Sequence, residues 1–172
     1  MEQEKIEVQQ AKNDVLIMAE RMASLYYFMV NSMLEETDEE TTERVVRRAI
    51  LNYGLDCGKN AKEKVSSMNL PITLPNYALG KDLPSLGWES KKLDLGKAGV
   101  KASEISFCPL AAKWKQLGFE RWGRMYCYVD QAKYRGYCDQ MTCYHDKNLL
   151  DGDECCVVRI VDESVPQPEE GK

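Results

Sequence analysis

No part of this sequence is apolar enough to cross a membrane, and no part is basic enough to hold nucleic acid. A membrane-spanning helix needs about 20 consecutive, mostly apolar residues, and no segment approaches that length. The 172 residues include 23 Lys and Arg against 28 Asp and Glu, a net charge of −5. Because the two signs are interleaved, no basic patch is available for phosphate groups. We therefore expect no membrane partner and no nucleic-acid partner.

Histidine is nearly absent, and the Cys-x-x-Cys pair typical of a structural zinc module is missing. His145 is the single histidine, and there is no Cys-x-x-Cys motif. Structural zinc modules use such closely spaced pairs. The residues that remain as metal ligands are Cys108, Cys127, Asp130, Cys138, Cys143 and Cys155. Their spacing does not favour zinc, so we expect no metal and no other cofactor. We interpret His145 as a solvated loop residue rather than as the partner of a catalytic cysteine.

The beginning of the chain also lacks the apolar run of a secretory signal. Residues 1–5 are mostly charged or polar, whereas a signal peptide carries a continuous apolar segment. The seven cysteines cannot all pair with one another, because their number is odd. In a reducing compartment they would remain thiols. We therefore expect a cytoplasmic protein whose fold does not depend on disulfides.

The first third of the chain is helical in pattern. From about Glu4 to Glu36, apolar residues recur at alternating steps of four and three, which puts them on one helix face. These residues are Ala11, Val15, Met18, Met22, Leu25, Met29 and Met33. Thr37 or Asp38 then caps a second helix, which carries apolar residues from Val46 to Val65. The methionine-rich face favours core packing or a homo-oligomer contact over a ligand pocket.

The remainder of the chain mixes strands and short helices. Prolines and glycines predict a loop over residues 69–87, which would lie over a pocket. We then expect strands within 86–95, 100–107, 141–144 and 155–161, with short helices over 110–117 and 120–135. Helices followed by strands indicate an α+β fold, with long N-terminal helices packed on a small antiparallel sheet. Residues 1–162 would form a single domain, and 163–172 a disordered C-terminal tail.

Thiols and carboxylates recur in the C-terminal half, as expected of a small-molecule site. Cys108 is predicted to lie where a strand ends and Pro109 opens a helix. Its sulfur would then face N–H groups that lower the pKa of a thiol, which makes it a candidate nucleophile. A buried structural cysteine explains the same position equally well.

A second pair of candidates lies on the predicted helix over 120–135. Cys127 and Asp130 are three residues apart and would share a face, so the carboxylate can act on the thiol or on a water molecule. Asp151 and Asp153 belong first of all to a turn, but their carboxylates can also reach the site from a strand end. We expect Cys108, Cys127, Asp130 and one of these two aspartates to converge on one pocket.

Aromatic residues concentrate in the same region and suit a small, partly planar ligand. We assign Trp114, Tyr126, Tyr137 and Cys155 as candidate substrate contacts. An ordinary core would need the same aromatic residues. Cys155 and Cys156 would alternate on the last strand, so one of the two thiols must face away from the pocket.

The ordered set of these motifs resembles a known family. The motifs are Phe107-Cys108-Pro109-Leu110-Ala111, Tyr126-Cys127-x-x-Asp130, Gly136-Tyr137 and Leu150-Asp151-Gly152-Asp153-x-Cys155. Together they resemble the L-2-amino-thiazoline-4-carboxylic acid hydrolase family over about residues 15–162. The resemblance implies a hydrolase that opens a cyclic amidine or a related non-peptide C–N bond in a small-molecule substrate.

A second resemblance supplies the alternative function. Residues 98–161 are similar to small ligand-binding domains of the 4-vinyl reductase type, in their Cys-Pro motif, cysteine spacing and Gly-Asp-x-x-Cys pattern. It implies a non-catalytic sensor or carrier that binds a small molecule or a metal.

Overall fold

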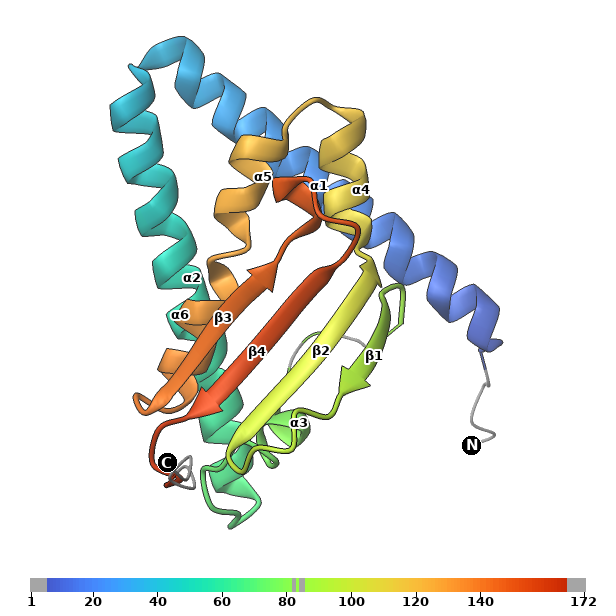
Figure 1. Ribbon diagram of the computed structural model, residues 1–172. Coiled ribbons are helices and arrows are strands. Elements are labelled where there is room, and N and C mark those ends of the chain that lie inside the picture. The colour runs from blue at the N-terminus through green and yellow to red at the C-terminus, as the bar shows by residue number, and fades with distance from the viewer. Residues whose placement is uncertain (1–5, 82, 84–85, 167–172) are drawn as a thin grey trace, which may run out of the picture.

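Two long helices, which diverge from a short turn, form the N-terminal part of the molecule (Figure 1). The computed structural model describes residues 6–81, 83 and 86–166. Helix α1 spans Val8–Glu36 and helix α2 spans Glu39–Ser67. Between them, the Asp38 carboxylate accepts a hydrogen bond of 2.8 Å from the Thr41 N–H and caps α2. The predicted end and restart of the helices are confirmed.

The second half contains one four-stranded sheet whose pairs are all antiparallel. Its strands are β1 (Glu89–Leu93), β2 (Val100–Phe107), β3 (Met141–Lys147) and β4 (Cys156–Asp162). The order is β1-β2-β4-β3, so β4 pairs with both β2 and β3. The α+β fold with a small antiparallel sheet is therefore confirmed.

Short helices connect the strands, and here several predicted boundaries change. Helix α4 (Pro109–Gln116) follows β2, and a single-turn helix, α3 (Tyr77–Gly80), lies within the predicted loop. The helix predicted over 120–135 is interrupted at Cys127 and Tyr128, which separates α5 (Glu120–Tyr126) from α6 (Val129–Tyr137). The 3-10 helix η1 (Leu149–Asp151) follows β3.

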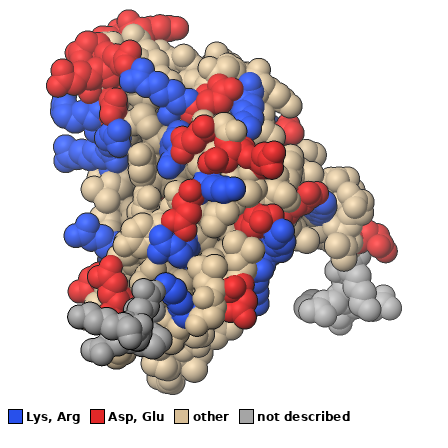
Figure 2. Space-filling view, in the orientation of Figure 1, with Lys and Arg blue, Asp and Glu red and all other residues tan. Residues whose placement is uncertain are grey.

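One face of the sheet is covered by helices and the other carries charges. Helices α2 and α6 lie behind the sheet in the view of Figure 1, where its near face is uncovered. Figure 2 shows acidic and basic side chains interspersed over that near side. Arg159 and Asp146 form one such pair, with Nε and Oδ2 at 2.8 Å. The covered face is therefore the one that can hold a buried site.

Glycines bring α2 and α6 into close contact. A Cβ added at Gly54 would meet Ala132 and the carbonyl oxygen of Val129, and one at Gly58 would meet the Lys133 carbonyl oxygen. Only residues without a side chain permit this approach. Because α6 is held so close to α2, its first turn projects toward the space between the helices and the sheet.

Two apolar clusters hold these layers together. One joins α1 to α4 and α5 around Trp114 and Trp122, and the other joins α2, α3 and α6 to the sheet around Tyr137 and Ile160. Within the described part of the chain, no helix has the length and apolar character that crossing a bilayer would require. The expected disorder of the tail concerns residues 163–172, of which 167–172 lie outside the described residues. The assignment of a single domain stays a prediction.

Candidate functional site

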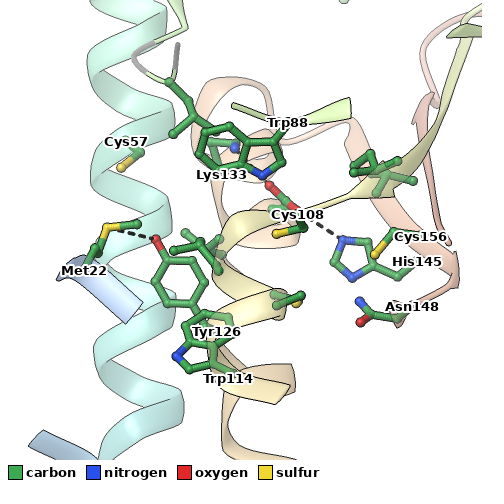
Figure 3. Close-up of a pocket in the computed structure, with 18 of the residues that line it drawn as sticks. Met22, Cys57, Trp88, Cys108, Trp114, Tyr126, Lys133, His145, Asn148 and Cys156 are labelled. Atoms are coloured by element: carbon green, nitrogen blue, oxygen red, sulfur yellow. Dashed lines mark hydrogen bonds and ion pairs between the residues drawn. The ribbon is translucent and has the colours of Figure 1, made fainter. Parts of the chain in front are cut away.

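A cavity of about 220 Å³ lies between the two long helices and the covered face of the sheet. Figure 3 shows Met22 and Cys57 on the side of the long helices and Cys108, His145 and Cys156 on the side of the strands. Most of its wall is apolar or aromatic. This wall includes Met22, Trp88, Ile105, Leu110, Trp114, Tyr126, Val129 and Val158.

The polar end of the cavity is organised around Asp130, in the first turn of α6. Its Oδ1 lies 2.9 Å from Lys133 Nζ, and its Oδ2 lies 3.2 Å from His145 Nε2. Burial alone would raise the pKa of Asp130, but the Lys133 ammonium and the hydrogen bond from His145 outweigh it and hold the pKa well below its ordinary value. Asp130 is therefore an ionised carboxylate.

His145 is the buried partner of this carboxylate. It lies on β3 with only 2% of its side chain exposed, and its Nδ1 is buried without a hydrogen-bond partner in the described structure. Because an ionised carboxylate can only accept hydrogen bonds, Nε2 carries the proton of the shared bond. In the neutral ring, Nδ1 then presents a lone pair. The interpretation of His145 as a solvated loop residue is wrong, since β3 extends beyond 144 and turns this residue inward.

Lys133 balances the charge of Asp130. Its side chain is 14% exposed. Burial alone would lower the pKa of Lys133, but the adjacent Asp130 carboxylate raises it above its ordinary value. A lysine held in its charged form is not a nucleophile. It stabilises the carboxylate instead.

Cys108 occupies the position that the sequence predicts, as N-cap of α4, and its side chain lines the cavity. Burial raises the pKa of the Cys108 thiol, although the N–H groups of Ala111, Trp88 and Leu110 act in the opposite direction. The sulfur makes no N-capping hydrogen bond. The expectation of a lowered pKa is therefore wrong, because desolvation outweighs the helix N-terminus.

Cys127 also lines the cavity, although it lies in the turn between α5 and α6 rather than within a helix. Burial raises the pKa of its thiol to about 12, while the side chain of Asn148 acts in the opposite direction. Its sulfur lies 3.9 Å from the Gly123 carbonyl oxygen. Cys127 is thus a protonated thiol near neutral pH.

Of the predicted site residues, Cys108, Cys127, Asp130, Trp114 and Tyr126 line the cavity. The other four do not. Asp151 is exposed and forms an ion pair of 2.8 Å with Arg124. Asp153 accepts a hydrogen bond of 2.7 Å from the Asn148 N–H. Tyr137 belongs to the second apolar cluster and bonds to the Thr73 carbonyl oxygen.

Cys155 is the fourth residue outside the cavity, and Cys156 lines it instead. β4 begins at Cys156 and points Cys156 and Val158 inward. None of the seven cysteines forms a disulfide.

Sequence reasoning missed several lining residues, namely Cys57, Trp88, Lys133, His145, Asn148 and Cys156. Two of these had a detectable signal. Lys133 stands three residues after Asp130, a spacing that places them together on a helix. His145 continues the alternation of Met141 and Cys143, which face the core. Among the described residues, no group of three or more His, Cys, Asp or Glu side chains is placed to hold a metal.

Comparison with known proteins gives one family and one fold. Residues 18–160 match the family described as L-2-amino-thiazoline-4-carboxylic acid hydrolase. No curated protein matches the chain. The fold is similar to that of a trafficking protein particle complex subunit 3 from Naegleria fowleri, covalently bound to palmitic acid. That similarity has a TM-score of 0.52 and 16% identity, and covers 89% of this chain and 96% of that chain. At this identity it shows the fold alone.

Proposed function

Since the chain belongs to the L-2-amino-thiazoline-4-carboxylic acid hydrolase family, we propose that it hydrolyses a cyclic amidine or a related non-peptide C–N bond in a small molecule. The observation that carries this proposal is the buried pair of Asp130 and His145, with the unpartnered Nδ1 of His145 in the wall of a small cavity. A carboxylate that orients a histidine for proton transfer is a recurring arrangement in hydrolytic sites.

The pair can carry both proton transfers of such a reaction. His145 Nδ1 removes a proton from water while the water oxygen bonds to the amidine carbon. Asp130 stabilises the resulting imidazolium through Nε2. The imidazolium then returns this proton to the ring nitrogen. When the C–N bond breaks, the hydroxyl group on the carbon loses its proton to His145, which passes it to the leaving nitrogen, so both hydrogens of the water end on the amine.

A cysteine offers a second route at the same site. Cys108 can attack the amidine carbon once His145 has taken its proton, and water then releases the product from the sulfur. Because burial raises the pKa of the Cys108 thiol, this route needs a base, whereas the water route needs no thiol. Replacing Cys108 by Ser or Ala therefore separates the two routes.

The size of the cavity favours a compact substrate. Pockets for drug-sized ligands measure about 300–1,000 Å³, and this cavity is about 220 Å³. A single five-membered ring with a carboxylate substituent is of suitable size. Its ring would lie against Trp114 and Tyr126, and its amidine would face Asp130 and His145.

The direct test is incubation of the purified protein with 2-aminothiazoline-4-carboxylate and its close analogues, followed by mass spectrometry. Ring opening adds one water to the substrate. Cleavage of the C–N bond leaves a free amine, whereas cleavage of the C–S bond leaves a free thiol, so a thiol reagent distinguishes these isomeric products. We expect turnover by the wild type with release of an amine.

The variants Asp130→Asn and His145→Gln should lower kcat by about 10²-fold or more, because each removes part of the proton-transfer pair. Asp146→Asn is the matched control, since that carboxylate lies on the same strand as His145 but pairs with Arg159 outside the cavity. Absence of turnover by the folded wild-type protein across the panel would refute the proposed reaction.

The second candidate function is a non-catalytic carrier or sensor. An apolar groove along α1 adjoins the cavity and shares Met22, Leu83 and Trp88 with it. The cavity also contains thiols that could carry a covalently attached chain, and the fold neighbour is a protein covalently bound to palmitic acid. Intact mass spectrometry of the purified protein distinguishes the two functions. A retained adduct, released by hydroxylamine, would favour the carrier, and an empty protein with turnover would favour the hydrolase.

We also propose that the protein acts in the cytoplasm, because seven cysteines without a disulfide persist as thiols in a reducing compartment. Fractionation of the source cells tests this location. Recovery of the protein with oxidised thiols from an extracytoplasmic fraction would contradict it.

A further inference from the structure

Asn148 is a buried polar residue of the cavity wall that the reaction described above does not use. It directly follows β3, and only 2% of it is exposed. Its Oδ1 accepts a hydrogen bond of 2.9 Å from the Leu150 N–H and caps η1. The acceptor atom of the amide is therefore occupied by the backbone, and the NH₂ group remains for the cavity.

The backbone of Asn148 is fixed by the turn that follows. Its N–H donates to Asp153 Oδ2 at 2.7 Å, and its carbonyl oxygen accepts from the N–H of Asp151 at 2.9 Å and of Asp153 at 3.3 Å. Asp153 thus bonds to Asn148 through both its carboxylate and its backbone. Asp153, which the sequence predicts as a catalytic carboxylate, therefore holds the backbone of Asn148 in place.

The side chain of Asn148 lines the same cavity as those of Cys127 and His145. Burial raises the pKa of the Cys127 thiol, and a hydrogen bond from the Asn148 side chain acts in the opposite direction. In Figure 3 the nitrogen of the Asn148 side chain lies on the side of His145 and Cys156. A rigidly held amide donor beside a general base is the arrangement that stabilises an oxygen on which charge develops.

We propose that Asn148 donates a hydrogen bond to the oxygen that adds to the substrate carbon, and that Asp153 is the residue that positions it. This inference rests on the proposed function. The oxygen comes from water and gains negative charge as His145 removes its proton. A donor that is already oriented needs no reorganisation during that step, and the turn over 148–153 supplies the orientation.

Two substitutions remove the amide NH₂ but keep an acceptor that can cap η1. Asp and Ser both retain an acceptor at an N-cap, so Asn148→Asp and Asn148→Ser should preserve the turn. We expect kcat to fall by about 10²-fold, while KM changes by less than about threefold. Asn13→Asp is the matched control, because that side chain is exposed on α1 and accepts a hydrogen bond from Gln9 that Asp can also accept.

The positioning by Asp153 is tested with a double-mutant cycle. Asp153→Ala should lower kcat by less than Asn148→Asp does, and should have little further effect once Asn148 has been replaced. Additive losses would overturn the positioning by Asp153. Unchanged kcat in both folded Asn148 variants would overturn the inference but leave the proposed hydrolase in place, whereas inactivity of the wild type would overturn both.

A readout without substrate tests the orientation of the amide directly. Alkylation of Cys127 at alkaline pH, followed by peptide mass spectrometry, should become slower in Asn148→Ser and in Asp153→Ala, because each removes or misplaces the amide NH₂. Alkylation of Cys155 outside the cavity should not change. Equal Cys127 rates in all variants would overturn the assigned orientation.

Discussion

At the scale of single residues, Asp130 links the chemistry of the cavity to the stability of the fold. Its pKa is held below the ordinary value against the effect of burial, by Lys133 and His145. A carboxylate with a lowered pKa in the folded state stabilises that state above its unfolded pKa, about 3.9. The contribution is lost as the pH falls through the range between the unfolded and folded values.

We therefore predict that the free energy of unfolding falls steeply below about pH 4 in the wild type and much less steeply in Asp130→Asn. At pH 7 the variant should be less stable by about 3 kcal/mol, because it leaves the buried Lys133 ammonium uncompensated. Urea denaturation at pH 7 and pH 3 measures both effects. Asp146→Asn, at a carboxylate whose side chain is 41% exposed, should change the pH dependence far less. The same pH dependence of the free energy of unfolding in the wild type and in Asp130→Asn would contradict the prediction.

The second prediction concerns the rates at which the thiols react with an alkylating reagent. Burial raises the pKa of Cys127 to about 12, so only about one part in ten thousand is thiolate at pH 8. Iodoacetamide at this pH should therefore modify Cys155, which is partly exposed, at least about 100-fold faster than Cys127. Peptide mapping over time gives both rates, and prior unfolding in urea should abolish the difference. Faster labelling of Cys127 would indicate an activated thiol.

Residue chemistry alone predicted part of this site. Cys108, Cys127 and Asp130 could be named because proline, helical spacing and residue type are local signals. The sequence pattern predicts Cys155 as a substrate contact, but Cys156 lines the cavity, since a shift of one residue in the start of a strand reverses which side chains face inward. The prediction of a solvated His145 is wrong because the environment of this residue depends on how far β3 continues, which is decided by pairing with β4.

At the scale of secondary-structure elements, the contact between α2 and α6 determines where Asp130 lies. We predict that Gly58→Ala destabilises the protein by about 2 kcal/mol, although alanine is the better helix former by about 1 kcal/mol. The added methyl group would meet the backbone of α6 at Lys133 and Tyr137, which cannot rotate away. Thermal and chemical unfolding measure the change.

Asn60→Ala serves as the control for that substitution, because Asn60 is exposed on the same helix. The free energy of unfolding of Asn60→Ala should differ from that of the wild type by less than about 0.5 kcal/mol. Stabilisation by Gly58→Ala would mean that α6 can move away from α2, and the position of Asp130 would then not be fixed by this contact.

The sequence predicts the helices and strands that have a continuous apolar periodicity, but it does not predict where a helix is interrupted. The two long helices and β2 follow from periodicity, and β2 has the predicted bounds. No glycine or proline marks the break between α5 and α6, which falls at Cys127 and Tyr128. It arises because α5 packs with α1 and α4, whereas α6 packs against α2 and β3. Tertiary packing, rather than local propensity, therefore sets that boundary.

At the scale of the whole molecule, α1 carries an apolar surface that the described residues of the chain leave uncovered. Ile17, Met18, Leu25, Phe28 and Met29 are exposed along this helix. Exposed apolar patches of this kind often mark contact surfaces, so the expectation of a homo-oligomer stays a prediction. Light scattering over a range of concentrations should show association, and Phe28→Glu should weaken it. A monomer of constant mass at all concentrations would remove this expectation.

The position of β4 determines when the sheet can be completed during synthesis. In the chain β4 follows β3, but in the sheet it lies between β2 and β3. While a ribosome extends the protein, β2 and β3 have no shared neighbour until Cys156–Asp162 has left the exit tunnel. Cys108 after β2 and His145 on β3 are therefore brought to one cavity only at that moment. A chain released early, before β4, would lack the assembled site however well its helices had formed.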